Sequence, residues 1–186
     1  LSRILLPSRR AMEPLYQLSL DEVVSYLLEL GKHLKTATNP HLQWALELAK
    51  AFNDVPPHMV RNAMDSFQDR FLTRSNLEGM IDTVGREHLD GWQRHERDSG
   101  RISYIRAFGV PTAHVIAGNG PSVAMMTLVR NALIRGYAIV KIPSNELGTA
   151  VALARTAIDM APDHPLTKAF SAVYWRGGDD TFESRL

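Results

Sequence analysis

The residues of this sequence best suited to chemistry are four polar side chains that follow two apolar stretches within residues 112–145. Asn119 lies between two glycines just past the first stretch, and Lys141 lies at the end of the second. Ser144 and Asn145 follow shortly after, in a turn that contains proline. Amide, ammonium and hydroxyl groups are hydrogen-bond donors, so these side chains could bind or orient a ligand.

The pattern around these residues predicts a βαβ unit. The apolar runs 114–117 and 137–142 have the composition of strands, and the residues between them carry an apolar stripe at helical spacing, with Ser122 as N-cap and Gly136 as the end. Strand, helix and strand with short links are typical of a parallel sheet, whose ligands bind at the carboxyl ends of the strands. Both polar turns lie at such ends, where we expect the chemistry.

Each of the four residues also has a simpler interpretation. Asn-Gly is a common turn dipeptide because both residues tolerate positive φ, so Asn119 could merely shape a turn. Lys141 could extend into solvent, and Ser144 and Asn145 could be an N-cap pair for the helix that follows. The residues alone leave both alternatives open at each position.

Several other chemistries lack their sequence motifs. GNGPS forms neither GxGxxG nor a P-loop, no GxSxG occurs, and the 7 histidines show no metal-ligand spacing, so no metal site is expected. The chain has no cysteine, which excludes a cysteine nucleophile within it and fits a cytoplasmic protein. A formal net charge of +1 gives no indication of nucleic-acid binding. The sequence has no run of 18 apolar residues, so no membrane span is expected.

The rest of the chain divides by the period of its apolar residues. Capping boxes and helical stripes predict four helices in the first half, over 20–33, 40–53, 57–70 and 76–95. From residue 100 the period changes to 2, and 101–108 is predicted to be a strand, either of the main sheet or of an oligomerisation hairpin. A further strand is predicted at 172–175, parallel to those at 114–117 and 137–142.

Taken together, these residues resemble the aldehyde dehydrogenase superfamily, specifically the acyl-CoA reductase branch typified by the fatty-acid reductase of bacterial bioluminescence. In the superfamily one strand leads into PWNxP and the next closes in KPS. AGNGP matches at Asn119 and Pro121, and VKIPSN matches at Lys141, although Ala-Gly replaces Pro-Trp and Ile142 separates the lysine from Pro-Ser. HPLT and VYWRGGDD are similar to the acyl-CoA reductase branch.

The resemblance implies an α/β fold in two parts. A helical N-terminal segment would cover 1–99, and a truncated, Rossmann-like cofactor-binding domain with a parallel sheet would cover 100–186, with the catalytic domain absent. The implied activity is reduction of an acyl-CoA or acyl-carrier thioester to an aldehyde, with NADPH as cofactor and NADH possible. The nucleophilic cysteine would lie beyond this chain, and a homo-oligomer or an acyl-donating partner protein would be possible.

The resemblance also implies roles for individual residues. Asn119 would donate its amide to the oxyanion of the thiohemiacetal, and Lys141 would hydrogen-bond the adenosine ribose. Ser144 and Asn145 would lie where the 2′-hydroxyl or 2′-phosphate is recognised, with Gly118 beside the cofactor. The competing hypothesis is a non-catalytic binding or scaffold module of the same fold, because the chain has no nucleophile. A cysteine encoded past Leu186 would favour the reductase.

Overall fold

The computed structural model describes residues 9–52 and 54–184, so the last residue of the predicted helix 40–53 lies outside the described residues. Its helices are η1 (Arg9–Met12), α1 (Glu13–Tyr16), α2 (Leu20–Lys32), α3 (Pro40–Phe52), α4 (Pro57–Asp65), α5 (Phe67–Phe71), α6 (Arg74–Val84), α7 (Arg86–Asp90), α8 (Pro121–Leu133), α9 (Thr149–Met160), α10 (Pro165–Lys168) and α11 (Asp180–Glu183). Its strands are β1 (Gln93–Glu96), β2 (Ile102–Ile105), β3 (Pro111–Val115), β4 (Tyr137–Lys141) and β5 (Phe170–Val173).

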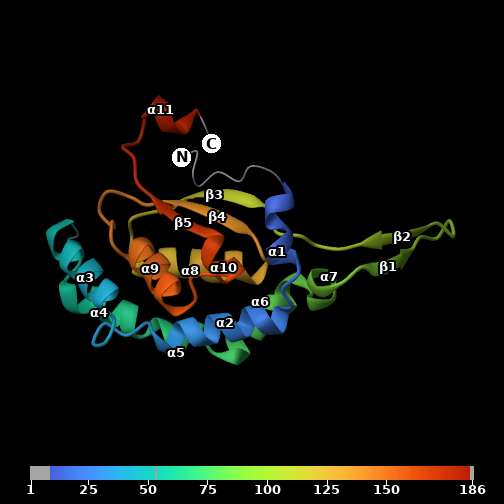
Figure 1. The fold of residues 1–186 in the computed structure, drawn as a ribbon, viewed down its shortest axis with the longest axis horizontal. Coiled ribbons are helices and arrows are strands. Elements are labelled where there is room, and N and C mark those ends of the chain that lie inside the picture. The colour runs from blue at the N-terminus through green and yellow to red at the C-terminus, as the bar shows by residue number, and fades with distance from the viewer. Residues whose placement is uncertain (1–8, 53, 185–186) are drawn as a thin grey trace.

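The main sheet has the order β3-β4-β5, and all its strands run parallel (Figure 1). This confirms the predicted parallel α/β arrangement, with α8 and α9 as the connections between the strands. β3 begins three residues earlier than the predicted 114–117, at Pro111, which pairs with Tyr137. A proline has no N–H to donate and is tolerated at the first residue of an edge strand. β5 begins at Phe170, two residues before the predicted 172–175.

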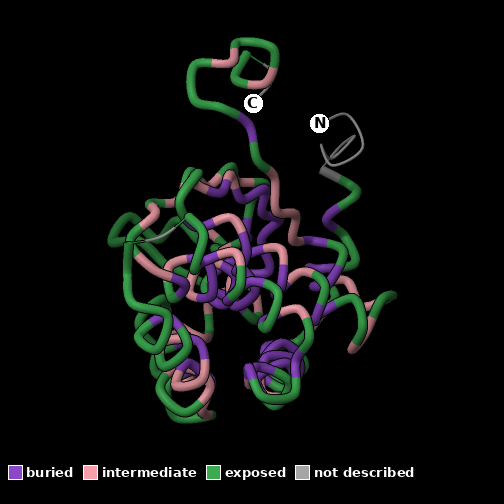
Figure 2. The backbone as a smooth tube through the Cα atoms, turned by 90° about the vertical axis from the view of Figure 1, so that its left-hand side faces the viewer, coloured by how far each residue is buried: buried purple, intermediate pink, exposed green. Residues whose placement is uncertain are grey.

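Helices cover one face of this sheet. Figure 1 shows α8, α9 and α10 against the sheet and α2 on their far side. The outward residues of β3, with Val115 at 73% exposure, have no such cover among the described residues. Buried residues concentrate inside the main body, whereas the segment with α11 extends away from it (Figure 2). Asn119, Ser144 and Asn145, which follow the carboxyl ends of β3 and β4, are exposed, so these strand ends lie at an accessible edge.

The ends of α8 differ from the prediction. The helix begins at Pro121 with Gly120, at φ 147°, as its N-cap, so Ser122 is not the cap. At the other end the left-handed residue is Arg135, with φ 55°, and not Gly136. Tertiary contacts hold Arg135 in this conformation: its buried guanidinium donates to the carbonyl oxygens of Leu18, at 2.7 Å, and of Leu89. Such long-range contacts are not visible in the local sequence.

The helices of the first half follow the predicted apolar stripes. Ser19 and Glu22 form the predicted capping box at the start of α2. The predicted helix 57–70 is two helices, α4 and α5, joined at Ser66. The predicted helix 76–95 is interrupted at Gly85, whose φ of 97° is incompatible with a continuing helix, so α6 and α7 replace a single helix. The prediction is wrong beyond Asp90, where α7 ends.

The charged residues after α7 form a strand and not a helix end. β1 pairs antiparallel with β2, with Glu96 opposite Ile102, and the turn between them includes Gly100 at φ 76°. Of the two alternatives for the run 101–108, the structure thus supports a separate hairpin, since β2 does not join the main sheet. The hairpin extends away from the body (Figure 1).

One continuous apolar core joins the helical half to the sheet half. Its buried residues include members of both halves, and α3 packs closely on α9, where Gly148 lies against Ala45. The division at residue 100 therefore stays a prediction. None of the described helices is long and apolar enough to cross a membrane.

Candidate functional site

Two loops meet at the carboxyl ends of β3 and β4, and a hydrogen bond joins them. The side-chain amide of Asn145 donates to the carbonyl oxygen of Gly118 over 2.8 Å. A Cβ added to Gly118 would lie 1.7 Å from Oδ1 of Asn145, so this close approach requires a glycine. Nearby, the backbone N–H of Ile116 donates to the carbonyl of Lys141 over 3.2 Å. The structure thus brings Gly118, Lys141 and Asn145 to one edge of the sheet.

Lys141 is half-buried at the end of β4 and lies over an aromatic ring. Its Nζ is 5.5 Å from the ring centroid of Trp175, which follows β5. Trp175 is buried, stacks on Phe182 and donates Nε1 to the Glu183 carboxylate over 3.3 Å. A cation–π contact is worth about 0.5–1 kcal/mol at a partly exposed site, so it orients the lysine and leaves its N–H donors available for a ligand. Sequence analysis missed Trp175 because its contact depends on the β4–β5 pairing.

The side chains of Asn119 and Ser144 are exposed near this edge. Asn119 does not have the positive φ that favours asparagine in turns, because Arg135 is the only non-glycine residue with positive φ in the described part of the chain. Ser144 and Asn145 do not cap the next helix, since Gly148 holds the N-cap position of α9. A positive-φ turn at Asn119 and a helix cap at Ser144 and Asn145 are thus excluded, while the roles assigned to these residues stay predictions.

Glu146 is a buried carboxylate that sequence analysis did not single out. It is 6% exposed, and its Oε1 accepts from the N–H of Thr149 over 3.1 Å and from the Thr149 hydroxyl over 2.5 Å. Its Oε2 is buried without a hydrogen-bond partner among the described residues. Burial raises the pKa of Glu146, and the hydrogen bonds from Thr149 oppose that shift. The carboxylate thus anchors the start of α9 directly after the loop that carries Ser144 and Asn145.

The donors at this edge fit a ligand with hydroxyl and phosphate groups. Lys141 supplies an ammonium, Ser144 a hydroxyl and Asn119 an amide, while the loop through Gly118 leads into the N-terminus of α8, a position that favours anions. A dinucleotide offers both ribose hydroxyls and a pyrophosphate, so the residues present fit such a cofactor. Within residues 9–52 and 54–184, no group of three or more histidine, aspartate or glutamate side chains could hold a metal ion.

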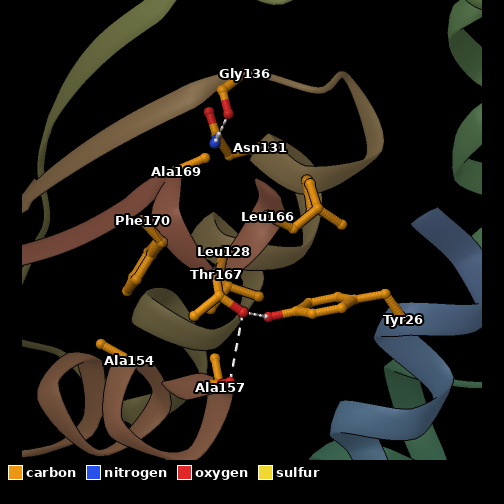
Figure 3. Close-up of a pocket in the computed structure, with 11 residues that line it drawn as sticks. Tyr26, Leu128, Asn131, Gly136, Ala154, Ala157, Leu166, Thr167, Ala169 and Phe170 are labelled. Carbon is orange, nitrogen blue, oxygen red and sulfur yellow. Dashed lines mark hydrogen bonds between the residues drawn. The ribbon is translucent and has the colours of Figure 1, made fainter. Parts of the chain in front are cut away.

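A small interior cavity behind the sheet is separate from these loops (Figure 3). Its volume is about 10 Å³, which is room for at most one water. The hydroxyl of Tyr26 lies 2.8 Å from the Thr167 hydroxyl, which donates in turn to the carbonyl of Ala157 over 3.4 Å. The pKa of Tyr26 is raised by burial, although its bond to Thr167 opposes this. These contacts connect α2 to α10 and α9, so the polar groups around the cavity stabilise the packing of these helices.

Solved structures show the same fold. Lactaldehyde dehydrogenase from Escherichia coli is similar over 90% of this chain and 32% of its own, with a TM-score of 0.60 and 15% identity. Gamma-glutamyl phosphate reductase from Thermotoga maritima is similar over 93% of this chain and 42% of its own, with a TM-score of 0.52 and 14% identity. At such low identity the similarity shows the fold alone, and it confirms the aldehyde dehydrogenase type of architecture.

Comparison with proteins of similar sequence identifies the family of the chain within this fold. The chain is 27% identical over 170 residues to a long-chain acyl-protein thioester reductase of Vibrio harveyi. The aligned region covers 90% of this chain and 35% of the relative. A protein of the same name from Photorhabdus laumondii is 27% identical over 168 residues, and the aligned region covers 89% of this chain and 34% of that relative. The chain thus spans about a third of the length of these relatives. The family described as Acyl-CoA reductase (LuxC) matches residues 15–186, and the chain therefore belongs to that family.

Proposed function

We propose that this chain is the cofactor-side part of a reductase that converts an acyl thioester, carried by CoA or by a carrier protein, into an aldehyde. The observation that carries the proposal is the hydrogen bond from Asn145 to Gly118, which holds the two motif loops together at the open edge of the sheet. The names of the relatives, long-chain acyl-protein thioester reductases, support the substrate class.

The reaction needs a cysteine outside this chain, since these 186 residues contain none. Its thiolate attacks the thioester carbonyl carbon, the bond to the departing thiol breaks, and the acyl group remains on the cysteine. NADPH, when bound, would supply a hydride to the acyl carbon, and the bond from this carbon to the cysteine sulfur would break, which releases the aldehyde and restores the thiolate. The residues of this chain bind and orient the reacting groups.

Asn119 serves as the oxyanion donor in this proposal. Its exposed side chain lies on the loop between β3 and α8, and an added Cβ on the neighbouring Gly120 would meet no atom of the described residues within 4 Å, so a ligand can come close to the backbone there. Negative charge develops on the acyl oxygen only as the thiolate attacks, so the amide stabilises the transition state more than bound substrate. Lys141 binds the adenosine ribose, and Ser144 and Asn145 lie where the 2′-phosphate of NADPH would be recognised, with NADH as the less favoured cofactor.

Asn119→Gly in the complete, cysteine-containing enzyme tests the oxyanion role. Removal of the amide should lower kcat about a hundredfold or more, because one such donor contributes about 3 kcal/mol, while NADPH affinity stays near normal. The matched control is Asn62→Ala, which removes an exposed asparagine side chain on α4. Stopped-flow or steady-state reduction of an acyl-CoA measures kcat, and fluorescence titration measures NADPH binding. A variant that folds and keeps the parent's rate would remove Asn119 from the site.

Lys141→Met tests the cofactor site separately. Methionine keeps an unbranched apolar stem against Trp175 but removes the ammonium, so NADPH binding should weaken without a change in thermal stability. Comparison of NADPH with NADH in the same titrations separates contacts to the 2′-phosphate from contacts to the ribose. Unchanged affinity for both cofactors would exclude Lys141 as a ligand.

The absence of cysteine from this chain favours the second candidate, a non-catalytic module of the same fold. Incubation of the complete protein with a radiolabelled acyl-CoA distinguishes the two candidates, because only the reductase forms a covalent acyl-protein from which NADPH then removes the label.

We further propose that the protein is cytoplasmic. Residues 1–99 form a helical segment and residues 100–186 a partial cofactor-binding domain in this proposal, and association of copies or an acyl-donating partner completes the assembly.

A further inference from the structure

The residues that follow β5 form an arm, residues 175–183, that folds back onto its own first residue. The arm consists of Trp175, a loop and α11, and Gly178 in the loop has a φ of 80°, a value that favours glycine. The ring of Phe182 on α11 stacks on the buried indole of Trp175, with 5.8 Å between the ring centroids and 9° between the ring planes. The contacts of the arm thus converge on one indole.

Glu183 closes the arm with a single carboxylate oxygen. Its Oε1 accepts from Nε1 of Trp175 over 3.3 Å and from the backbone N–H of Gly178 over 3.1 Å. These two bonds fix the edge of the indole relative to the loop. An N–H donated to a carboxylate also increases the electron density of the ring, because hydrogen-bonded groups polarise one another. Both effects favour contact between the indole and a cation.

The cation that meets this indole is Lys141, whose Nζ lies 5.5 Å from the ring centroid. The two residues meet because β4 and β5 pair with Lys141 opposite Val173, two positions before Trp175. A lysine ammonium lies on a flexible stem, so without a fixed neighbour it would sample many positions. The arm therefore reaches the proposed cofactor site through one side chain.

We infer that the arm is a positioning element for the dinucleotide. Glu183 and Phe182 hold Trp175 in place, and the indole holds the Lys141 ammonium where the adenosine ribose binds. The inference rests on the proposed cofactor role of Lys141 and adds residues that act through that lysine without touching the ligand themselves. Linkage makes the relation reciprocal, so a bound dinucleotide that favours this position of Lys141 must also favour the closed arm.

A double-mutant cycle of Trp175→Leu with Lys141→Met in the complete enzyme tests the inference. Trp175→Leu should weaken NADPH binding about twofold to fivefold, the effect of one cation–π contact, with KM for NADPH raised and kcat unchanged. In the Lys141→Met background the same substitution should change the affinity by less than about 1.5-fold, because the partner of the ring is gone. Trp175→Phe keeps an aromatic ring and should lose less than Trp175→Leu.

Glu183→Ala tests the other end of the arm and should weaken NADPH binding about twofold, because the indole loses its acceptor. Glu183→Gln keeps an acceptor for Trp175 and Gly178 and should stay close to the parent's affinity. The matched control is Asp180→Ala, which removes another exposed carboxylate of α11 and should leave the affinity unchanged. A loss of equal size in Glu183→Ala and Asp180→Ala would contradict the role of Glu183.

Hydrogen exchange of the backbone amides provides a measurement that does not depend on turnover. Saturating NADPH should slow exchange in residues 177–183 of the unsubstituted enzyme but not in Lys141→Met. Equal losses from Trp175→Leu in both backgrounds, or exchange that NADPH slows equally in both or in neither, overturn the role of the arm and leave the proposed function intact. Unchanged NADPH affinity in Lys141→Met itself overturns the proposed role of that lysine, and this inference with it.

Discussion

At Gly118, one added methyl group tests the contact between the loop that follows β3 and the loop that follows β4. Gly118→Ala would place a carbon on the Asn145 side chain and break its hydrogen bond to the Gly118 carbonyl. One such bond is worth about 1 kcal/mol, so NADPH binding to the complete enzyme should weaken about fivefold. Isothermal titration measures the affinity.

Gly177→Ala is the control for this change, because an added Cβ there meets no atom of the described residues within 4 Å. It should leave both affinity and melting temperature unchanged. Equal affinities for Gly118→Ala and Gly177→Ala would show that the contact between the loops has no part in cofactor binding.

Glu146 should make the stability of the protein depend on pH. Because its pKa is raised above the ordinary 4.5 in the folded state, the folded protein holds this proton more tightly than the unfolded chain does. That contribution to stability is fully present below pH 4.5 and is lost as the pH rises through the raised value. Glu146→Gln keeps an acceptor for Thr149 and carries no charge.

The glutamine variant should therefore be more stable than the unsubstituted protein at pH 7 and lose this advantage at pH 4. Urea unfolding at both pH values measures the two free energies. An advantage of equal size at both pH values would mean that the glutamine acts through packing and that ionisation of Glu146 is not the cause.

The sequence was sufficient to place Asn119, Lys141 and Asn145 at strand ends, because strand periodicity and turn residues are local properties. Glu146 and Trp175 could not be found in that way. The burial of Glu146 follows from packing at the start of α9, and the ring of Trp175 reaches Lys141 only because β4 and β5 pair. The bond between Asn145 and Gly118 likewise joins residues 27 positions apart.

At the scale of elements, long apolar stripes predicted α2, α3 and α8 well. Where the sequence is charged or its apolar stripe is interrupted, the local pattern did not predict the observed element. Residues 93–96 have little apolar character, so nothing local indicates the strand that pairing with β2 imposes. Arg135 takes the left-handed position after α8 because its guanidinium reaches two distant carbonyl groups. In both cases a tertiary contact decided the local conformation.

The packing of α3 on α9 depends on Gly148. An added Cβ would lie 2.6 Å from Cα of Ala45, so Gly148→Ala must separate the two helices. We expect a loss of about 1–3 kcal/mol in the free energy of unfolding, the usual cost of overpacking. Urea unfolding, followed by circular dichroism, measures it.

Gly79→Ala is the matched control, since Gly79 is exposed within α6 and an added Cβ there meets no atom of the described residues within 4 Å. Alanine there should stabilise the helix by about 0.5–1 kcal/mol. A single unfolding transition of the Gly148→Ala variant would indicate that residues 1–99 and 100–186 unfold together, whereas two unfolding transitions would indicate separate domains. A variant as stable as the parent would contradict the tight contact between α3 and α9.

At the scale of the whole molecule, the β1–β2 hairpin extends from the body with apolar side chains in the open (Figure 1). Trp92, Ile102, Tyr104 and Ile105 are each about half exposed or more, at 60%, 48%, 62% and 47%. A two-stranded hairpin is marginally stable alone, and such a surface favours association. We therefore expect the hairpin to pack against another copy of the protein.

Tyr104→Asp should lower the sedimentation coefficient of the complete enzyme towards that of a monomer, because a charge would be buried at the contact. Tyr174→Asp is the control, since Tyr174 is similarly exposed, at 51%, but lies outside the hairpin. An assembly that persists in Tyr104→Asp, or that dissociates equally in both variants, would exclude the hairpin as the contact.

The hydrogen bond from Asn145 to Gly118 has a thermodynamic consequence for the order in which ligands bind. In the proposed function, a dinucleotide that orders the loop of Asn145 would also restrain the loop of Asn119, so part of the entropy cost of ordering the proposed acyl site would be met before the thioester arrives. Linkage requires the effect to be reciprocal: a bound acyl group must raise the affinity for the dinucleotide by the same factor. The two ligands would then bind with positive cooperativity through a single amide.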